Sequence, residues 1–224
     1  MPTALITGAS RGLGAAIAQE LESTHRILLG GRDEAALQPL ADHLPDADPW
    51  TVDLTDRAAV SEAASTVKSL DVLVHNAGMA EIGSIRDTPL SVWESTLEVN
   101  LLAIVHLTRE LLPALRLAGG HVVLINSGAG LRANAGWSAY AASKFALRAF
   151  ADALRLEEPA LRVTSIFPGR IDTDMQRSIV ATEGREYEPD EFLRPATVAQ
   201  AVAHAIRMPR DGHPTEVVLR PKRT

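Results

Sequence analysis

Tyr140 and Lys144 stand four residues apart in the segment YAASK, and Ser127 lies thirteen positions before the tyrosine. The chain has three lysines against nineteen arginines and only two tyrosines, so its composition alone would not place a lysine beside a tyrosine. Residues four apart share one face of a helix. An ammonium beside a phenol favours the phenolate and lowers the pKa of the phenol. We therefore expect Tyr140 to donate and accept a proton near neutral pH.

A glycine-rich turn, TGASRGLG at residues 7–14, follows the first apolar segment. The glycines Gly8, Gly12 and Gly14 allow a tight turn and a close approach of the backbone to a pyrophosphate. The helix that begins there offers free N–H groups and the positive end of its dipole. A turn of this kind without a ligand is the structural alternative. Its place after the first strand of an α/β pattern favours a bound dinucleotide.

Two arginines near this turn bear on the choice between NAD and NADP. Ser10 and Arg11 offer a hydroxyl and a cation, and Arg32 follows the second predicted strand, where an NAD enzyme would carry an acid. Arginines bind a 2′-phosphate through charge-assisted hydrogen bonds. We therefore expect NADP(H) in preference to NAD(H). The alternative is that Arg32 is a solvated surface residue, and the acidic Asp33 beside it keeps that alternative open.

Apolar segments alternate with amphipathic ones along the whole chain. The pattern predicts strands at residues 3–7, 26–30, 50–54, 71–75, 121–126, 162–167 and 216–219. It predicts helices at residues 12–21, after Asp33, and at 56–67, 91–115, 137–157 and 195–207. Strands joined through helices pair in parallel. We expect one domain over residues 1–224, a Rossmann-like, doubly wound parallel α/β sheet of about seven strands with helices on both faces. Residues 172–194 are charged and lack clear periodicity, so we expect a substrate lid there.

Bulk composition excludes several classes of function. A net charge of −6 leaves no basic stripe for nucleic acid. The absence of cysteine excludes disulfides and thiolate catalysis. No apolar run is long enough to cross a bilayer, and the N-terminal residues show no signal-peptide pattern. We expect a cytoplasmic protein that binds neither nucleic acid nor membrane.

The ordered set of motifs resembles the short-chain dehydrogenase/reductase family over nearly the whole chain. The resemblance rests on TGxxxGxG, Asp53, the NAG segment at 76–78, Asn100, Ser127, YxxxK and the PG pair at 168–169 with Thr173. Each motif is common alone, whereas the ordered set is specific. The chain departs from the family at His75, where an asparagine often stands. We assign His75 no proton transfer.

The resemblance implies a role for each matching residue. Tyr140 would be the general acid and base, Ser127 would bind the substrate oxygen, and Lys144 would bind the nicotinamide ribose. Asn100 would hold a water that links Lys144 to solvent. The remaining residues implied to contact the cofactor are Leu13, Asp53, Leu54, Asn76, Ala77, Gly78, Pro168, Gly169, Ile171 and Thr173. No metal is implied, because the cofactor carries the hydride chemistry.

Some of these residues have structural alternatives. Asn100 could be a satisfied polar residue within a helix, and Asp53 could cap the next turn. Ser138 and Ser143 compete with Ser127 by residue type, but the strand-end position favours Ser127. A purely packing role for Tyr140 is disfavoured by Lys144.

The substrate is expected to be a small carbonyl compound or its alcohol. An apolar pocket would come from Ala129, Leu131, Trp137 and Met175. Arg132 or Arg170 could anchor an acidic group, although exposed arginines usually anchor nothing. The leading hypothesis is an NADP(H)-dependent oxidoreductase that forms a homodimer or homotetramer. The alternatives are an NAD-linked alcohol dehydrogenase and a non-catalytic regulator that senses NADP.

Overall fold

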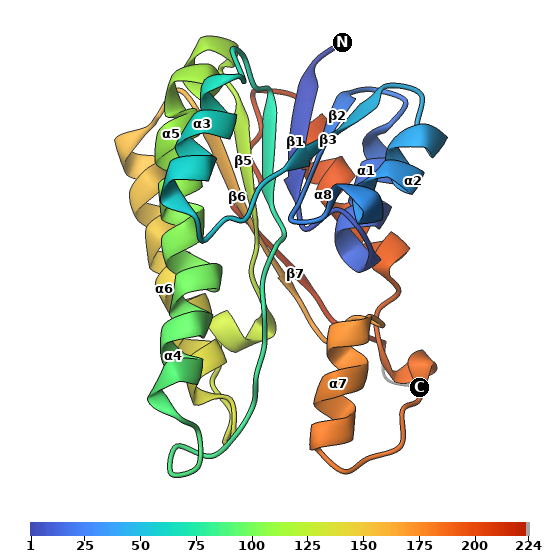
Figure 1. Cartoon of the computed structure of the whole chain (residues 1–224), viewed down its shortest axis with the longest axis vertical. Helices are drawn as coiled ribbons and strands as arrows, with labels where there is room; N and C mark the ends of the chain where they lie inside the picture. The colour runs from blue at the N-terminus through green and yellow to red at the C-terminus, as the bar shows by residue number, and fades with distance from the viewer. Residues whose placement is uncertain (223–224) are drawn as a thin grey trace.

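Seven strands form a single sheet in the order β3-β2-β1-β4-β5-β6-β7 in the computed structural model, which describes residues 1–222 (Figure 1). All neighbouring strands in this order are parallel. The strands are β1 (Thr3–Thr7), β2 (Arg26–Gly31), β3 (Ala47–Thr51), β4 (Val72–His75), β5 (His121–Ile125), β6 (Arg162–Pro168) and β7 (Glu216–Leu219). The predicted parallel sheet of seven strands is confirmed.

Helices cover both faces of the sheet, as predicted. The helices are α1 (Gly12–Leu21), α2 (Glu34–His43), α3 (Arg57–Ser65), α4 (Leu90–Leu97), α5 (Ala103–Ala118), α6 (Ser138–Glu157), α7 (Asp174–Thr182) and α8 (Pro195–Arg207). Figure 1 shows α1, α2 and α8 on one side of the strands, and α3, α5 and α6 on the other. None of the helices in residues 1–222 is both long and apolar enough to span a membrane.

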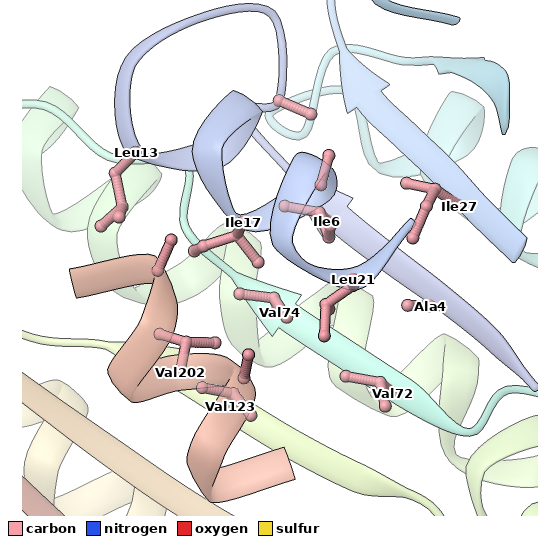
Figure 2. Close-up of a cluster of buried hydrophobic side chains, with 14 of the residues drawn as sticks. Ala4, Ile6, Leu13, Ile17, Leu21, Ile27, Val72, Val74, Val123 and Val202 are labelled. Carbon is pink, nitrogen blue, oxygen red and sulfur yellow. The ribbon is translucent and has the colours of Figure 1, made fainter. Parts of the chain in front are cut away.

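Successive residues of a strand point to opposite faces, so each strand contributes to two hydrophobic cores. In β1, Ala4 and Ile6 pack under α1 and α8, whereas Leu5 belongs to the cluster under α3, α5 and α6. Figure 2 shows the first cluster, in which Ile17 of α1 and Val202 of α8 meet the sheet. Burial on both faces explains why the strands are continuously apolar.

The strand order reverses between β1 and β4, which are hydrogen-bonded neighbours. The chain proceeds outward from β1 through β2 to β3, then returns to β4 and continues outward to β7. In open α/β sheets a crevice forms at such a reversal, beyond the carboxyl ends of the strands. The loops after β1 and β4 are therefore placed to hold a ligand.

The third strand begins three residues earlier than predicted, at Ala47 instead of Trp50. It includes Pro49, which lacks a backbone N–H and usually argues against a strand. β3 lies at the edge of the sheet and pairs only with β2, so a proline is tolerated there. Asp53 and Leu54 consequently lie in the loop after β3, not at the end of the strand.

The long helix predicted at residues 91–115 is three consecutive helical segments. α4 leads into a π-helical turn, Glu98–Leu102, which leads into α5. Asn100 lies at the centre of that turn, and π-turns within α-helices are frequent at functional sites. α5 continues past Pro113 to Ala118 and ends at Gly119, which has the left-handed conformation with φ of 58°.

The segment predicted to be an irregular lid contains a regular helix, α7, followed by a short 3₁₀ turn at Pro189–Glu191. Thr173 caps α7 through a hydrogen bond that its Oγ1 accepts from the Gln176 backbone N–H. The pattern Thr-x-x-Gln is a capping-box signature that predicts a helix start here. Figure 1 shows α7 (orange) apart from the helices that cover the sheet.

Candidate active site

A cleft of about 900 Å³ opens at the carboxyl ends of the strands. Its walls come from the loops that follow β1 to β6, from the start of α6 and from α7. The structure brings to this cleft all the predicted catalytic and cofactor-binding residues except Asn100 and Gly14, which lie behind its wall. Residues far apart in the sequence therefore meet at one site.

The glycines of the turn after β1 are required by its geometry. Gly8 and Gly12 have φ of 65° and 59°, a backbone region that side chains with a Cβ rarely adopt. A Cβ on Gly14 would lie 2.2 Å from the Gly8 carbonyl oxygen and 2.6 Å from Nδ2 of Asn76. Gly14 therefore lets α1 pack directly against the turn, although it does not face the cleft.

Thr7 and Asn76 join the ends of β1 and β4 beneath the cleft. Oγ1 of Thr7 accepts hydrogen bonds from the backbone N–H groups of Asn76 and Ala77, and both donor–acceptor distances are 3.0 Å. Nδ2 of Asn76 donates to the carbonyl oxygens of Thr7 at 2.9 Å and Gly8 at 3.1 Å. Asn76 thus fixes the glycine-rich turn as well as lining the cleft. The positioning role of Thr7 was missed by the sequence analysis, which treated it only as part of a motif.

The first turn of α1 keeps its backbone N–H groups available. The residue that caps the helix, Arg11, is extended and makes no side-chain capping bond, and no acidic residue lies in the first turn. Uncapped N–H groups at a helix N-terminus bind anions such as phosphate. The Arg11 guanidinium lies 3.6 Å from the Asp174 carboxylate of α7, and both side chains are mostly exposed.

Arg32 and Asp53 line the other side of this end of the cleft. Asp33 does not line it, because its Oδ1 caps α2 by accepting a 3.0 Å hydrogen bond from the Ala35 N–H. Oδ1 of Asp53 accepts from the N–H and Oγ1 of Thr55. These hydrogen bonds lower the pKa of Asp53, and the nearby Arg32 cation adds to the effect. Asp53 therefore both closes the local turn and faces the cleft.

Ser127, Tyr140 and Lys144 meet at the opposite end of the cleft. Nζ of Lys144 lies 5.7 Å from the centre of the Tyr140 ring and donates a 2.9 Å hydrogen bond to the Ile125 carbonyl oxygen. Ser127 and Tyr140 both line this end of the cleft. The helical spacing of four residues therefore places the two side chains on one face of α6, as predicted.

The expected low pKa of the phenol is not found. Burial raises the pKa of Tyr140, and the nearby Ser127 side chain opposes this only in part. Burial also lowers the pKa of Lys144 from 10.5 to about 8. The physical reason is that both groups are withdrawn from water, which disfavours their charged forms. A phenol with a raised pKa is protonated at neutral pH and can act as a proton donor.

Asn126 positions the catalytic end of the cleft, a role that the sequence analysis missed. It is buried at the end of β5, and its Oδ1 accepts a 2.8 Å hydrogen bond from the Ser127 N–H. Its Nδ2 donates a 3.1 Å hydrogen bond to the Lys144 carbonyl oxygen. A Cβ on Gly130 would lie 2.4 Å from Oδ1 of Asn126. Asn126 therefore ties the Ser127 loop to α6.

Asn100 is fully buried and uses its whole side-chain amide within the protein. Its Oδ1 accepts from the Met79 N–H, and its Nδ2 donates to the Met79 carbonyl and to Oγ of Ser143. These bonds join the loop after β4 to α6. The side chain of Asn100 therefore matches the structural alternative, in which all of its hydrogen bonds are made within the protein. The proton relay implied by the family resemblance remains a prediction.

The loop after β6 forms the floor of the cleft. Pro168, Gly169, Ile171 and Thr173 all line it, as predicted. A Cβ on Gly169 would lie 2.8 Å from Cδ of Pro221. The side chain of Thr173 is engaged as the cap of α7, and its Oγ1 donates to the Ile171 carbonyl oxygen.

The substrate end of the cleft agrees only in part with the sequence analysis. Ala129, Trp137, Met175 and Arg170 line it, whereas Leu131 and Arg132 do not. Asn134 and Arg220 line it as well, and Gln176, Ile179 and Glu183 line it from the segment expected to be the lid. Arg220 lies after β7, where no motif marked it. The capping box Thr-x-x-Gln, which ends at Gln176, marks the start of α7.

His75 lies outside the cleft lining and is fully buried in β4. Its Nε2 lies 2.9 Å from Oγ1 of Thr108, which itself donates to the Ile104 carbonyl oxygen. Burial lowers the pKa of His75 to about 3. The histidine is therefore neutral, in agreement with its assignment to no proton transfer.

The residues present fit a dinucleotide. The glycine turn admits close approach, the N-terminus of α1 offers free N–H groups, and arginines flank it. Tyr140, the buried Lys144 and Ser127 face the far end of the same cleft. One end of the cleft thus offers groups suited to binding phosphate, and the other end offers groups suited to donating a proton, an arrangement that fits hydride transfer from a nicotinamide.

Comparisons with known proteins agree with this geometry. The sequence model of the family described as short chain dehydrogenase matches residues 2–184. A protein named uncharacterized short-chain type dehydrogenase/reductase y4eK from Sinorhizobium fredii is 35% identical over 216 residues, which cover 92% of this chain and 86% of the relative. Glycine betaine reductase ATRR from Emericella nidulans is 35% identical over 236 aligned residues, which cover 98% of this chain but only 18% of that protein.

A solved structure extends the similarity to three dimensions. The alcohol dehydrogenase of the archaeon Thermococcus sibiricus, complexed with 5-hydroxy-NADP, superposes with a TM-score of 0.92 at 28% identity. The match covers 100% of this chain and 99% of that structure. Fold, site and sequence thus agree, and the chain belongs to the short-chain dehydrogenase family of oxidoreductases.

Proposed function

We propose that this chain is an NADP(H)-dependent oxidoreductase that interconverts a ketone or aldehyde and its alcohol. The observation that carries the proposal is the single cleft that has the glycine turn at one end and Ser127, Tyr140 and Lys144 at the other. A bound nicotinamide supplies or accepts the hydride. The protein then has to bind the substrate oxygen and deliver or remove one proton.

Tyr140 is the proposed general acid in reduction and the base in oxidation. Its raised pKa keeps the phenol protonated at neutral pH, which suits donation to a developing alkoxide. Ser127 and Tyr140 both line this end of the cleft, so a carbonyl oxygen placed between their hydroxyl groups would be held by two O–H donors. Lys144 provides a cation within 5.7 Å of the ring centre and stabilises negative charge that develops there.

NADP(H) is the proposed cofactor, in preference to NAD(H). The second strand ends without an acid facing the cleft, since Asp33 is turned to cap α2. Arg11 and Arg32 both line that end and offer guanidinium donors to a 2′-phosphate. The complex of the Thermococcus sibiricus relative with 5-hydroxy-NADP supports the same cofactor class.

Residues 172–194, which include α7, are proposed to be the substrate lid of a single catalytic domain. α7 contributes Met175, Gln176 and Ile179 to the cleft. We also propose a cytoplasmic homodimer or homotetramer. Leu102 and Phe145 are apolar yet 47% and 42% exposed on neighbouring helices, which favours a partner surface there. Light scattering of the purified protein measures the mass of the assembly.

The test is oxidation of NADPH across a panel of ketones and aldehydes, with NADH in parallel. The wild type is expected to turn over at least one carbonyl with NADPH, and Tyr140→Phe to lose about 10²–10⁴-fold in kcat while still binding NADPH. Full turnover by the phenylalanine variant would refute the mechanism. Binding of NADPH without any turnover would favour the regulator. Faster use of NADH would favour the NAD-linked alcohol dehydrogenase.

A further inference from the structure

Arg170 lies at the substrate end of the cleft, one aromatic ring away from Tyr140. The centre of the Trp137 ring is 5.9 Å from the centre of the Tyr140 ring, and Cζ of Arg170 lies 6.0 Å from the same indole. Phe192 flanks the guanidinium from another side, with its ring centre 5.5 Å from Cζ. Aromatic contacts on two sides hold the guanidinium in place.

Arg170 differs from an ordinary surface arginine. Its side chain is only 30% exposed, and its Nη2 donates a 2.7 Å hydrogen bond to the Glu183 carboxylate at the end of α7. Its Nε is buried and has no hydrogen-bond partner within residues 1–222. A guanidinium offers five N–H donors, and a single contact from Glu183 leaves most of them unused. Nη1, unlike Nε, is not buried, so an acceptor in the cleft can reach its N–H donors.

The charged side chains that line the cleft carry an excess of positive charge. Within residues 1–222 it is lined by five cations and three carboxylates, although the chain carries a net charge of −6. Gln176 of α7 is only 5% exposed, and its Nε2 is a second buried N–H donor without a partner. The cations are Arg11, Arg32, Lys144, Arg170 and Arg220, and the carboxylates are Asp53, Asp174 and Glu183.

These features identify the missing acceptor. We propose that the substrate carries a carboxylate, which Arg170 binds at the end of the cleft beyond Trp137. The inference rests on the proposed carbonyl–alcohol chemistry and makes its substrate an oxo acid or hydroxy acid. A planar guanidinium binds a carboxylate through two parallel hydrogen bonds. The two steps of 5.9 Å and 6.0 Å from Tyr140 to Arg170 suit a few carbon atoms between the carbonyl and the carboxylate.

Glu183 has a defined part in this arrangement. It holds the guanidinium through Nη2, but its negative charge also opposes a second carboxylate. Substitution by glutamine keeps an oxygen acceptor for Nη2 and removes the charge. Glu183→Gln is therefore expected to bind a carboxylate more tightly, whereas loss of Arg170 weakens it.

The kinetic test compares acids with their uncharged esters. Acetoacetate and levulinate are assayed with NADPH beside their methyl esters, in the wild type, Arg170→Met, Arg170→Lys and Glu183→Gln. The wild type is expected to use at least one acid about tenfold or more better than its ester in kcat/KM. Arg170→Met should raise the KM for that acid about tenfold or more and leave the ester unchanged. Arg170→Lys should recover only part of the loss, and Glu183→Gln should lower the KM for the acid.

Arg132→Met is the matched control, because Arg132 is an exposed arginine that lies outside the cleft lining. It should leave both the acid and the ester unchanged. Equal use of ester and acid by the wild type would overturn the inference while leaving the proposed function intact. An equal loss on acid and ester in Arg170→Met would assign Arg170 to packing and would overturn it as well.

A binding measurement separates failure of the inference from failure of the chemistry. Titration calorimetry of the protein saturated with NADP⁺ compares butyrate with butyramide, which have similar shapes but differ in charge. Butyrate is expected to bind more tightly than butyramide, and only in proteins that keep Arg170. If no carbonyl is reduced, the proposed function falls, and butyrate binding still decides whether Arg170 holds a carboxylate. Equal binding of the two probes would exclude it.

Discussion

Lys144 lies beside Tyr140, but the pKa of the phenol is raised and not lowered. Nζ of Lys144 is 5.7 Å from the ring centre and is bonded to the Ile125 carbonyl oxygen, while burial raises the pKa of Tyr140. Of the two groups, the lysine is the one that titrates near neutral pH, with a pKa of about 8. This relationship fixes how the rate should depend on pH.

The rate of carbonyl reduction is expected to fall as the pH rises through about 8. Above that value Lys144 loses its proton and its charge, whereas the phenol remains protonated because its pKa is raised. The measurement is kcat with NADPH at saturating carbonyl from about pH 6 to about pH 10. A rate that stays constant over this whole range would show that the charge on Lys144 plays no part.

Lys144→Met is expected to inactivate the protein and to stabilise it at neutral pH. Burial lowers the pKa of Lys144 in the folded state from 10.5 to about 8, so the unfolded chain binds more protons between these values. Wild-type stability should therefore rise with pH across that window, and below it the full cost of burying the charge is present. Removal of the charge should add roughly 1–3 kcal/mol near pH 7, less the lost hydrogen bond to Ile125.

Urea unfolding at about pH 7 and about pH 10 tests this expectation. The wild type should gain stability between the two, and the methionine variant should change little. If the methionine variant were less stable than the wild type at the lower pH, the interactions of the Lys144 ammonium in the folded protein would outweigh the cost of burying its charge.

Much of this molecule is predictable from local sequence signals. The strands are apolar on both faces because both are covered, and the parallel order follows from the helices that join them. Tyr140 and Lys144 could be paired because helical spacing is a local property. The glycine turn could be placed because Gly8, Gly12 and Gly14 leave a pattern that a turn demands.

What could not be predicted depends on contacts between distant segments. Asn126 has no motif of its own, and its role comes from Lys144, which is eighteen residues away. The pKa of Tyr140 follows from how deeply α6 is buried, which spacing does not reveal. Arg132 and Arg170 both follow strands in the sequence, and no local pattern distinguishes them. Only the fold shows that Arg170 lines the cleft and Arg132 does not.

Arg32→Ala is expected to raise the KM for NADPH about 10–100-fold and to leave the KM for NADH nearly unchanged. The arginine lines the end of the cleft proposed for the 2′-phosphate, and a hydrogen bond to a charged group contributes about 1.5–3 kcal/mol. Arg86→Ala is the control, since Arg86 is exposed and does not line the cleft. A similar rise in KM for NADPH and NADH would show that Arg32 contacts a part of the cofactor that both share, and not the 2′-phosphate.

Asn100→Ala should destabilise the protein by about 2–4 kcal/mol. The variant leaves the Met79 N–H and carbonyl without their side-chain partner and removes the donor to Ser143 Oγ, which keeps only its bond to the Tyr140 carbonyl. Thermal unfolding measures the loss. The kcat of the variant, taken well below its Tm, separates the two roles. A kcat close to that of the wild type would assign Asn100 to support of the site, and a large loss in the folded variant would support the proposed proton relay.

Gly14→Ala should disrupt the phosphate end of the cleft more than any change in the exposed loops. Its Cβ would stand 2.2 Å from the Gly8 carbonyl oxygen, so either α1 or the glycine turn must move. Overpacking against backbone costs about 1–3 kcal/mol, and a displaced turn no longer presents its N–H groups to a pyrophosphate. We expect both a lower Tm and weaker NADPH binding, measured by cofactor fluorescence.

Gly212→Ala is the matched control, because the nearest atom to its Cβ would be Cε of Met208 at 3.6 Å. If Gly14→Ala lowered the Tm but bound NADPH with unchanged affinity, the turn would not be the phosphate site, and the dinucleotide would have to enter the cleft in another orientation.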